Sequence, residues 1–239
     1  MSDRPSTILS DAVLSLRQGR FVLIHDFDRR ENETDMVIVA QHVTPDHVRA
    51  MRKDAGGLIC VAIRFDIADK LGLPYMPDIL KLASKEYPNL SELINSQASY
   101  GRSAFSISVN HRETFTGITD IDRATTIREI AKLCNLAMKG LDGVKDRFAK
   151  SFRSPGHVQL LIASEGLISE RNGHTELSVY LAQLAGLIPV TVICEMLDDE
   201  THKSLLTPSA KEYAKKHHMP FVDGHDIESY FRAHMKGLV

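Results

Sequence analysis

The stretch FVLIHDFDRRENETDMVIVA, residues 21–40, sets the fold and holds the first group of unusual polar residues. Its two apolar runs, 21–24 and 36–40, are each typical of a short buried strand. Between them, ten residues hold five carboxylates together with Arg29 and Arg30; the carboxylates belong to Asp26, Asp28, Glu31, Glu33 and Asp35. Clustered carboxylates repel one another unless cations offset their charge. The run therefore indicates a Mg²⁺ or Mn²⁺ site, or else a solvated acidic turn.

Strand and helix signals alternate along the rest of the chain. Further strands are predicted at 58–63, 104–109, 158–163 and 189–194. Helices are predicted at 7–18, 45–56, 126–139 and 175–184 and from Thr207 onward; Ser6 and Thr44 are expected caps, and Thr126 with Glu129 forms a capping box. Residues 72–103 are the least regular, with a helical turn at 90–94. Without a strict βαβ repeat, we expect one domain over 1–239: an α/β (α+β) sandwich with a mixed β-sheet flanked by helices.

The composition limits the class of protein. The chain has 29 basic and 31 acidic residues and no tryptophan, so neither a basic face nor an aromatic platform for nucleic acid is expected. No apolar run approaches the roughly 20 residues that span a bilayer, so no membrane association is expected. The three cysteines form no CxxC pair, and the N-terminus lacks a signal-type apolar region. We therefore expect a cytoplasmic protein with reduced thiols.

A second polar run, Arg171-Asn172-Gly173-His174-Thr175-Glu176, stands immediately before a predicted helix. The first amides of a helix are unpaired within it, so a phosphate can dock there. Arg171 could add a forked charge-assisted bond, and Gly173 lets the backbone approach a ligand closely. His174 could complete a mixed oxygen and nitrogen metal site, shuttle a proton, or simply cap the helix.

Four other places in the sequence are candidates for chemistry. Glu195 ends an apolar run, where a carboxylate suits a general acid or base, or an interior ion pair. His157 precedes a strand and is either catalytic or an ordinary polar residue at a strand edge. Cys60 could face the cleft, although buried filling is the simpler interpretation. Residues 122–126, which include Thr125, could hold a phosphate at a helix start.

These motifs together resemble the 3,4-dihydroxy-2-butanone 4-phosphate synthase family of riboflavin biosynthesis. The resemblance rests on residues 28–36 and 171–176, supported by 57–60, 116–118, 122–127, 155–158 and 194–195, in the family's order and over nearly the whole chain. Thr34 stands where many relatives have glycine, and 72–103 is longer than in many bacterial relatives. Only about 40 residues follow Glu195, so we expect the monofunctional form rather than a fusion to GTP cyclohydrolase II.

The resemblance implies a metal-dependent lyase that converts D-ribulose 5-phosphate to formate and L-3,4-dihydroxy-2-butanone 4-phosphate, in a homodimer with active sites near the interface. It implies Mg²⁺ (or Mn²⁺) on Glu31 and His174, which also border the substrate, and essential roles for His157 and Glu195. It implies substrate contacts by Arg30, Asp35, Arg171, Asn172, Gly173, Thr175 and Glu195, to which we add Thr125. We hypothesise that Asp35 or Glu33 is the first base. An isomerase that stops at the enediolate and a non-catalytic phosphometabolite-binding module are the alternatives.

Overall fold

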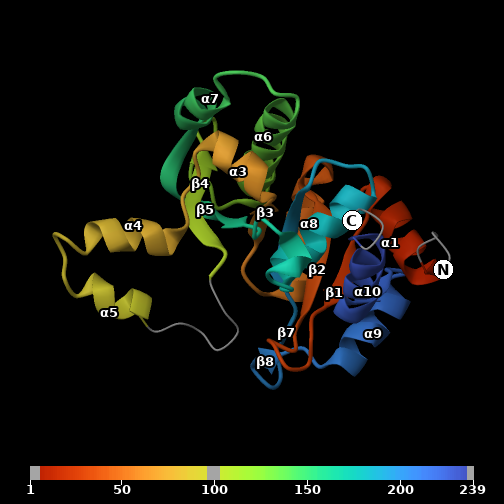
Figure 1. The fold of residues 1–239 in the computed structure, drawn as a ribbon. Coiled ribbons are helices and arrows are strands. Elements are labelled where there is room, and N and C mark those ends of the chain that lie inside the picture. The colour runs from red at the N-terminus through yellow and green to blue at the C-terminus, as the bar shows by residue number, and fades with distance from the viewer. Residues whose placement is uncertain (1–5, 96–102, 236–239) are drawn as a thin grey trace.

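A mixed seven-stranded sheet forms the centre of the protein (Figure 1). The computed structural model describes residues 6–95 and 103–235. Strands β3 and β5, and strands β1 and β9, pair in parallel, and the other neighbours are antiparallel. The order across the sheet is β4 (Phe105–His111), β5 (Phe152–Ile162), β3 (Cys60–Ile63), β6 (Val190–Glu195), β2 (Thr34–Val39), β1 (Val22–His25) and β9 (Phe221–Asp223).

Helices cover both faces of the sheet, because the side chains of each strand alternate between two apolar layers. In β2, Met36 and Ile38 enter one layer, whereas Val37 and Val39 enter the other. The first layer is closed by α2 (Pro45–Ala50), α3 (Phe65–Leu71), α6 (Asp120–Met138), α7 (Val144–Ser151) and α9 (Thr207–Lys216). The second is closed by α1 (Thr7–Arg17), α8 (His174–Leu184) and α10 (Gly224–Met235). The predicted sandwich with a mixed sheet is confirmed.

Most predicted elements are present, with shifted ends. The main error concerns α6, which begins at Asp120 and not at 126. Thr119 is its N-cap and accepts a hydrogen bond from the Asp122 amide. Thr126 lies inside the helix, where its hydroxyl accepts from the His111 amide, so the predicted capping box is wrong. The acidic run was expected to be a loop or the edge of a strand, and its last two residues, Thr34 and Asp35, begin β2.

The irregular stretch contains two short helices, α4 (Met76–Ala83) and α5 (Leu90–Asn95), which extend away from the sheet (Figure 1). The helical turn expected at 90–94 is thus confirmed, and residues 96–102 of this stretch lie outside the described residues. A two-stranded hairpin, β7 (Leu197–Asp198) with β8 (Lys203–Ser204), follows β6. Over residues 6–95 and 103–235, no helix has both the length and the apolar character to cross a membrane.

Candidate active site

The site lies where β2 and β6 meet the start of α8. Asp35 and Glu195 stand directly opposite each other in the β2–β6 pair, so both side chains project from the face that α8 covers. Asp35 is buried, and its Oδ1 atom has no hydrogen-bond partner among the residues that the structure describes. Buried carboxylate oxygens are normally paired, and an unpaired one beside a cluster of polar groups marks a place where a ligand can bind.

Asp26 organises the acidic loop that leads into β2. Its Oδ2 atom accepts hydrogen bonds from the Arg30 Nη1 atom at 3.0 Å and the Glu31 amide at 3.2 Å. Its Oδ1 atom accepts from the Glu33 amide at 3.0 Å. Because one buried carboxylate accepts hydrogen bonds from three donors of the loop, the loop has a defined shape. The alternative of a solvated acidic turn therefore does not describe this segment.

His174, the first residue of α8, meets this loop edge-on. Its Nε2 atom lies 3.2 Å from the Glu33 carbonyl oxygen, and its Nδ1 atom lies 3.4 Å from the Glu31 Oε2 atom. If Nε2 carries a proton for the carbonyl, Nδ1 is left to face Glu31 as a lone-pair donor. Asp35 Oδ1 lies 3.7 Å from Nε2, which places the imidazole between two carboxylates.

These contacts shift the pKa of each member of the group. Burial works against the charge on His174, but Asp35 and Glu31 outweigh it and raise its pKa to about 9. Partial burial also works against the charge on Glu31, yet His174 and Arg30 hold its pKa at about 2. Burial raises the pKa of Asp35 to about 7, helped by the nearby charge of Glu195. Shifts of this size in one pocket are typical of catalytic sites.

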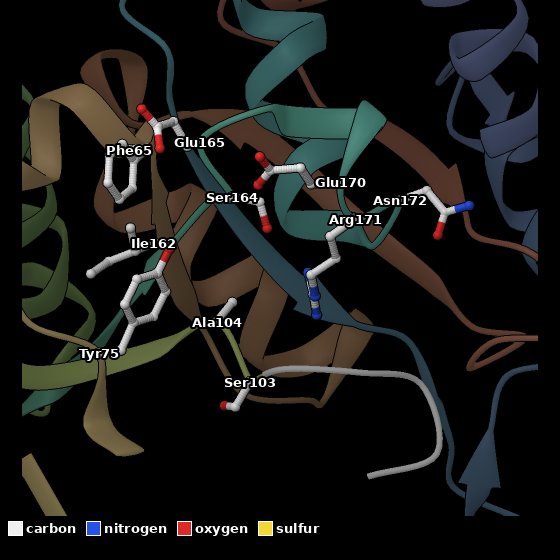
Figure 2. Close-up of a pocket in the computed structure, with 10 residues that line it drawn as sticks. All are labelled: Phe65, Tyr75, Ser103, Ala104, Ile162, Ser164, Glu165, Glu170, Arg171 and Asn172. Atoms are coloured by element: carbon white, nitrogen blue, oxygen red, sulfur yellow. The ribbon is translucent and has the colours of Figure 1, made fainter. Parts of the chain in front are cut away.

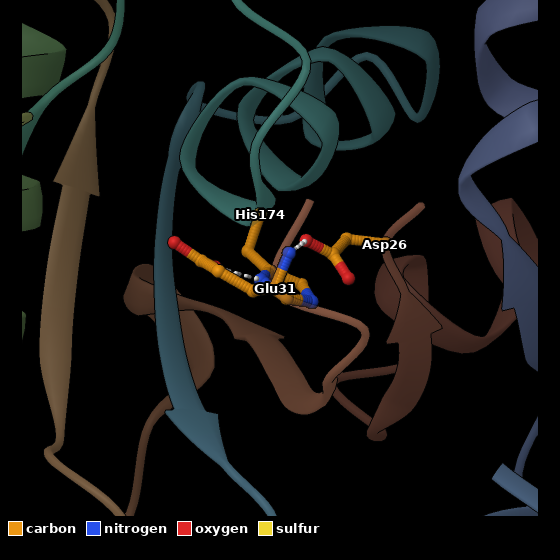
Figure 3. Close-up of side chains that lie close together, drawn as sticks. All are labelled: Asp26, Glu31 and His174. Atoms are coloured by element: carbon orange, nitrogen blue, oxygen red, sulfur yellow. Dashed lines mark hydrogen bonds and ion pairs between the residues drawn. The ribbon is translucent and has the colours of Figure 1, made fainter. Parts of the chain in front are cut away.

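The same residues fit a divalent cation. Asp26, Glu31 and His174 each offer one ligand atom, and these atoms all lie within 4.8 Å of one another (Figure 3). Carboxylate oxygens with one imidazole suit Mg²⁺ or Mn²⁺, and Asp35 adds a buried oxygen without a hydrogen-bond donor. Within the described residues, Glu31 Oε2 and His174 Nδ1 accept no backbone hydrogen bond. Both oxygens of Asp26, in contrast, accept hydrogen bonds from the loop.

Two arginines approach the start of α8 from different loops. A Cβ atom built on Gly173 would stand 2.6 Å from the Arg171 Nη1 atom and 2.6 Å from the Arg30 Nη2 atom. A side chain at this position would therefore have to displace both guanidinium groups, and glycine leaves them their place. Arg171 and Asn172 also border a cavity of about 490 Å³. Figure 2 shows Arg171 extending toward this space, with Phe65 and Tyr75 across from it.

Glu195 is held at the end of β6 by the chain that enters β3. Its Oε2 atom accepts a hydrogen bond from the Leu58 amide at 2.8 Å. Thr175, beside His174, is buried in the first turn of α8. Glu33, the other candidate base, points its Oε1 atom at the Ser204 hydroxyl of β8, 2.5 Å away. This contact holds the Glu33 carboxylate toward the hairpin.

Three predicted site residues form no hydrogen bond or ion pair with this cluster in the described part of the chain. His157 lies in β5, where its Nδ1 atom and amide contact the Asn110 side chain. Thr125 lies half-buried within α6, which covers the opposite face of the sheet. Cys60 shares the face of Asp35 and Glu195 but packs in the apolar layer. Burial, with the charges of those two carboxylates, raises the pKa of its thiol, which favours packing over nucleophilic chemistry.

Sequence reasoning assigned no separate task to Asp26, Glu176 or Asn110. In the sequence Asp26 is one of five clustered carboxylates, and only the tertiary structure shows that it accepts hydrogen bonds from its own loop. Glu176 belongs to the second polar run, but nothing in its spacing predicts that it contacts Ser164. Asn110 lies in a strand that is recognised by its alternating apolar residues, and nothing in this pattern indicates a role for its side chain.

Carboxylates and an imidazole around a cation-sized space, with two arginines beside it, define a metal-dependent enzyme that acts on a small anionic substrate. The family model of 3,4-dihydroxy-2-butanone 4-phosphate synthase matches residues 10–230, and the chain belongs to this family. The family converts ribulose 5-phosphate to 3,4-dihydroxy-2-butanone 4-phosphate in riboflavin biosynthesis, and this is the enzymatic function of the chain. The predicted lyase is thereby favoured over the isomerase and the binding module.

Relatives and a solved structure agree with this assignment. Proteins named 3,4-dihydroxy-2-butanone 4-phosphate synthase from Methanothermobacter thermautotrophicus and Archaeoglobus fulgidus are 49% and 50% identical to the chain. Each alignment covers 93% of the chain, with 96% and 93% of the respective relatives. A crystal structure of such a synthase in complex with two magnesium ions is 28% identical, with a TM-score of 0.74 over 92% of this chain and 94% of that one.

Proposed function

We propose that Glu31 and His174 hold the divalent ion, Mg²⁺ or Mn²⁺, and that the pocket around them binds D-ribulose 5-phosphate and releases formate. The observation that carries this is the meeting of two distant segments: Glu31 and the imidazole of His174 are 3.4 Å apart, beside a buried Asp35 oxygen that accepts no hydrogen bond from the described residues. When bound, a divalent ion supplies charge that stabilises the negative charge developing on the substrate oxygens.

Arg30 and Arg171 bind the substrate phosphate over Gly173. The support is that both guanidinium groups converge at the first turn of α8, where unpaired helix amides also favour an anion. Asn172 and Thr175, which flank Gly173 and His174 in the chain, complete the contacts with the phosphate. Glu31, His174 and Glu195 border the sugar. Thr125 contacts the substrate only if it belongs to a pocket shared between subunits.

Asp35 is the base that removes the proton beside the substrate carbonyl. Its pKa of about 7 leaves it partly ionised at neutral pH and a strong enough base to accept that proton. Glu33 is the weaker candidate because its carboxylate contacts the Ser204 hydroxyl. Glu195, opposite Asp35 on the neighbouring strand, delivers or accepts protons in the later steps.

His157 serves a site completed by a second subunit. Three strand spacings separate β5 from β2, which corresponds to about 14 Å between their main chains. Next to His157, an apolar surface presents Phe115, Ile118 and Ile121, with Phe115 91% exposed. Arg153 donates to the carbonyl oxygens of Thr114 and Phe115, so this surface is held in place. Large exposed apolar side chains on an ordered segment favour a homodimer interface.

We also propose that the protein works in the cytoplasm. All three cysteines are free and buried, which suits the reducing conditions of the cytoplasm.

The direct test is incubation with ribulose 5-phosphate and Mg²⁺, with and without a chelator, while formate is followed by NMR. Formate should appear only when the metal is available. Glu31→Gln should lose most turnover and still melt cooperatively, whereas Asp28→Asn, in the same loop and exposed, should keep it. Formate release by Glu31→Gln at the native rate would reject the proposed ligand.

The subunit arrangement needs its own experiment. Ile121→Asp should convert a dimer to a monomer in light scattering. A mixture of Glu31→Gln and His157→Ala proteins, refolded together, should regain activity if each pocket uses both subunits. If the mixture stays as inactive as its components, His157 acts within its own subunit or not at all.

A further inference from the structure

Two buried carboxylates stand behind the pair of arginines. Asp26 is 1% exposed and Glu176 is 0% exposed, and they come from the two loops that supply Arg30 and Arg171. A fully buried carboxylate is costly unless it is paired and hydrogen-bonded. The reason for keeping both must therefore lie in what they contact.

Asp26 pairs with Arg30 from one side. The Arg30 Nη1 atom lies 3.0 Å from its Oδ2 atom, and two loop amides occupy its remaining accepting positions. With these protein donors in place, Asp26 holds Arg30 and the loop rather than an ion. Glu31 also approaches Arg30 Nη1, at 2.6 Å, so this guanidinium end is surrounded by acceptors.

Glu176 pairs with Arg171 from the other side. Its Oε2 atom lies 2.5 Å from the Arg171 Nη1 atom, and its Oε1 atom accepts from the Ser164 amide at 3.0 Å. Because Ser164 follows β5, the Glu176 side chain links the end of that strand, the loop that carries Arg171, and α8. Placed in the first turn of α8, its charge is also favoured by the helix dipole.

The two guanidinium groups that these carboxylates hold are close together. Both approach the point where a Cβ of Gly173 would stand, and the buried Nε atom of Arg171 has no hydrogen-bond partner within residues 6–95 and 103–235. Two like charges at this separation repel each other unless opposite charges hold them. Asp26 and Glu176 supply one such charge on each side.

We propose that Asp26 and Glu176 are a matched pair of positioning residues, each of which fixes one arginine so that Arg30 and Arg171 together grip a single phosphate group. The inference rests on the proposed function, in which these arginines bind the substrate phosphate. Because the guanidinium groups are oriented before the substrate arrives, binding requires little rearrangement. Neither carboxylate touches the substrate.

The test removes each charge without changing the shape of the side chain. Glu176→Gln and Asp26→Asn should raise the KM for ribulose 5-phosphate by roughly 10- to 100-fold, the range for losing a charge-assisted contact. The effect on kcat should be smaller, because the base and the metal ligands remain. Asp28→Asn is the matched control, and its KM should stay at the native value. Native KM in both variants would overturn the inference.

A double-mutant cycle separates positioning from a general loss of structure. If Glu176 acts through Arg171, adding Glu176→Gln to an Arg171→Gln protein should change the KM little further. The cycle of Asp26→Asn with Arg30→Gln should behave in the same way. If the carboxylate substitution raised the KM by the same factor with and without the arginine substitution, the carboxylates would act independently of the arginines. A changed Mg²⁺ requirement with native KM in Asp26→Asn would instead make Asp26 a metal ligand.

Two further measurements keep the inference testable. Glu176→Asp retains the charge but withdraws it from Arg171 by one methylene, so it should fold if Glu176→Gln does not, and still raise the KM. Inorganic phosphate can be titrated against each folded variant by calorimetry without any turnover. If the native protein binds phosphate but releases no formate, the proposed function fails while the positioning pair stands. If formate appears but phosphate binds every variant equally, only the pair fails.

Discussion

Replacing Gly57 by alanine should damage the site through Glu195 rather than through the fold. A Cβ atom on Gly57 would stand 2.5 Å from the Glu195 Oε2 atom and 2.6 Å from the Glu195 carbonyl oxygen. Real Cβ atoms do not approach oxygen so closely, so one of the two segments must move. Rotation of the Glu195 side chain relieves only the contact with Oε2 and loses the hydrogen bond from the Leu58 amide, whereas the contact with the carbonyl oxygen requires a local shift of the β6 main chain at Glu195.

The size of the effect follows from these distances. Relieving the contact requires Glu195 to move by roughly 1 Å, and a displacement of this size in a reacting group costs about 100-fold in rate. Overpacking of this kind also lowers the free energy of unfolding by about 1–3 kcal/mol. We therefore expect the protein to stay folded at 25 °C, with kcat reduced about 100-fold and KM changed much less.

The assay compares initial rates of formate release with the thermal stability of the same preparation. Gly140→Ala is the control, since Gly140 has a φ of +70° and no atom of the described part of the chain lies within 4 Å of a built Cβ. That change should cost about 1 kcal/mol through backbone strain and leave kcat native. In the Glu195→Gln background, Gly57→Ala should reduce kcat little further. Native kcat in Gly57→Ala, or equal loss in both backgrounds, would refute the reasoning.

Other outcomes are expected from the same geometry. Asp35→Asn should reduce formate release by at least about 100-fold and Glu33→Gln by much less; the reverse order would make Glu33 the base. Without a metal ion His174 is protonated up to its pKa of about 9, so Mg²⁺ must displace that proton, and the apparent affinity should rise about tenfold per pH unit between pH 7 and 9 and then level. Calorimetry in buffers of different ionisation enthalpy should detect the released proton, and a pH-independent affinity would contradict the assignment. Gly156→Ala would bring Cβ 2.0 Å from the Val109 carbonyl carbon, so it should lower Tm by about 6–12 °C, and an unchanged melting curve would show that the β4–β5 bulge is adaptable.

The strands and most helices could be read from local patterns, because each is an apolar run with capping or turn residues at its ends. The α6 start was missed because two threonines, Thr119 and Thr126, both suit an N-cap, and local sequence does not choose between them. Thr119 caps the helix, whereas the Thr126 hydroxyl accepts a hydrogen bond from the His111 amide of β4. That contact spans 15 positions, so it lies beyond any local pattern.

The sequence by itself determined which residue types the candidate site offers, since residue type and motif predict Glu31, Asp35, His174 and Glu195 as its members. Only the tertiary structure decided which atoms meet, because the relevant contacts join segments more than 130 positions apart, such as Glu33 with His174 and Leu58 with Glu195. Burial then separated residues that look alike in the sequence. Asp26 is buried and accepts hydrogen bonds from its own loop, and Asp35 is buried with a raised pKa, whereas Asp28, two positions from Asp26, lies in solvent.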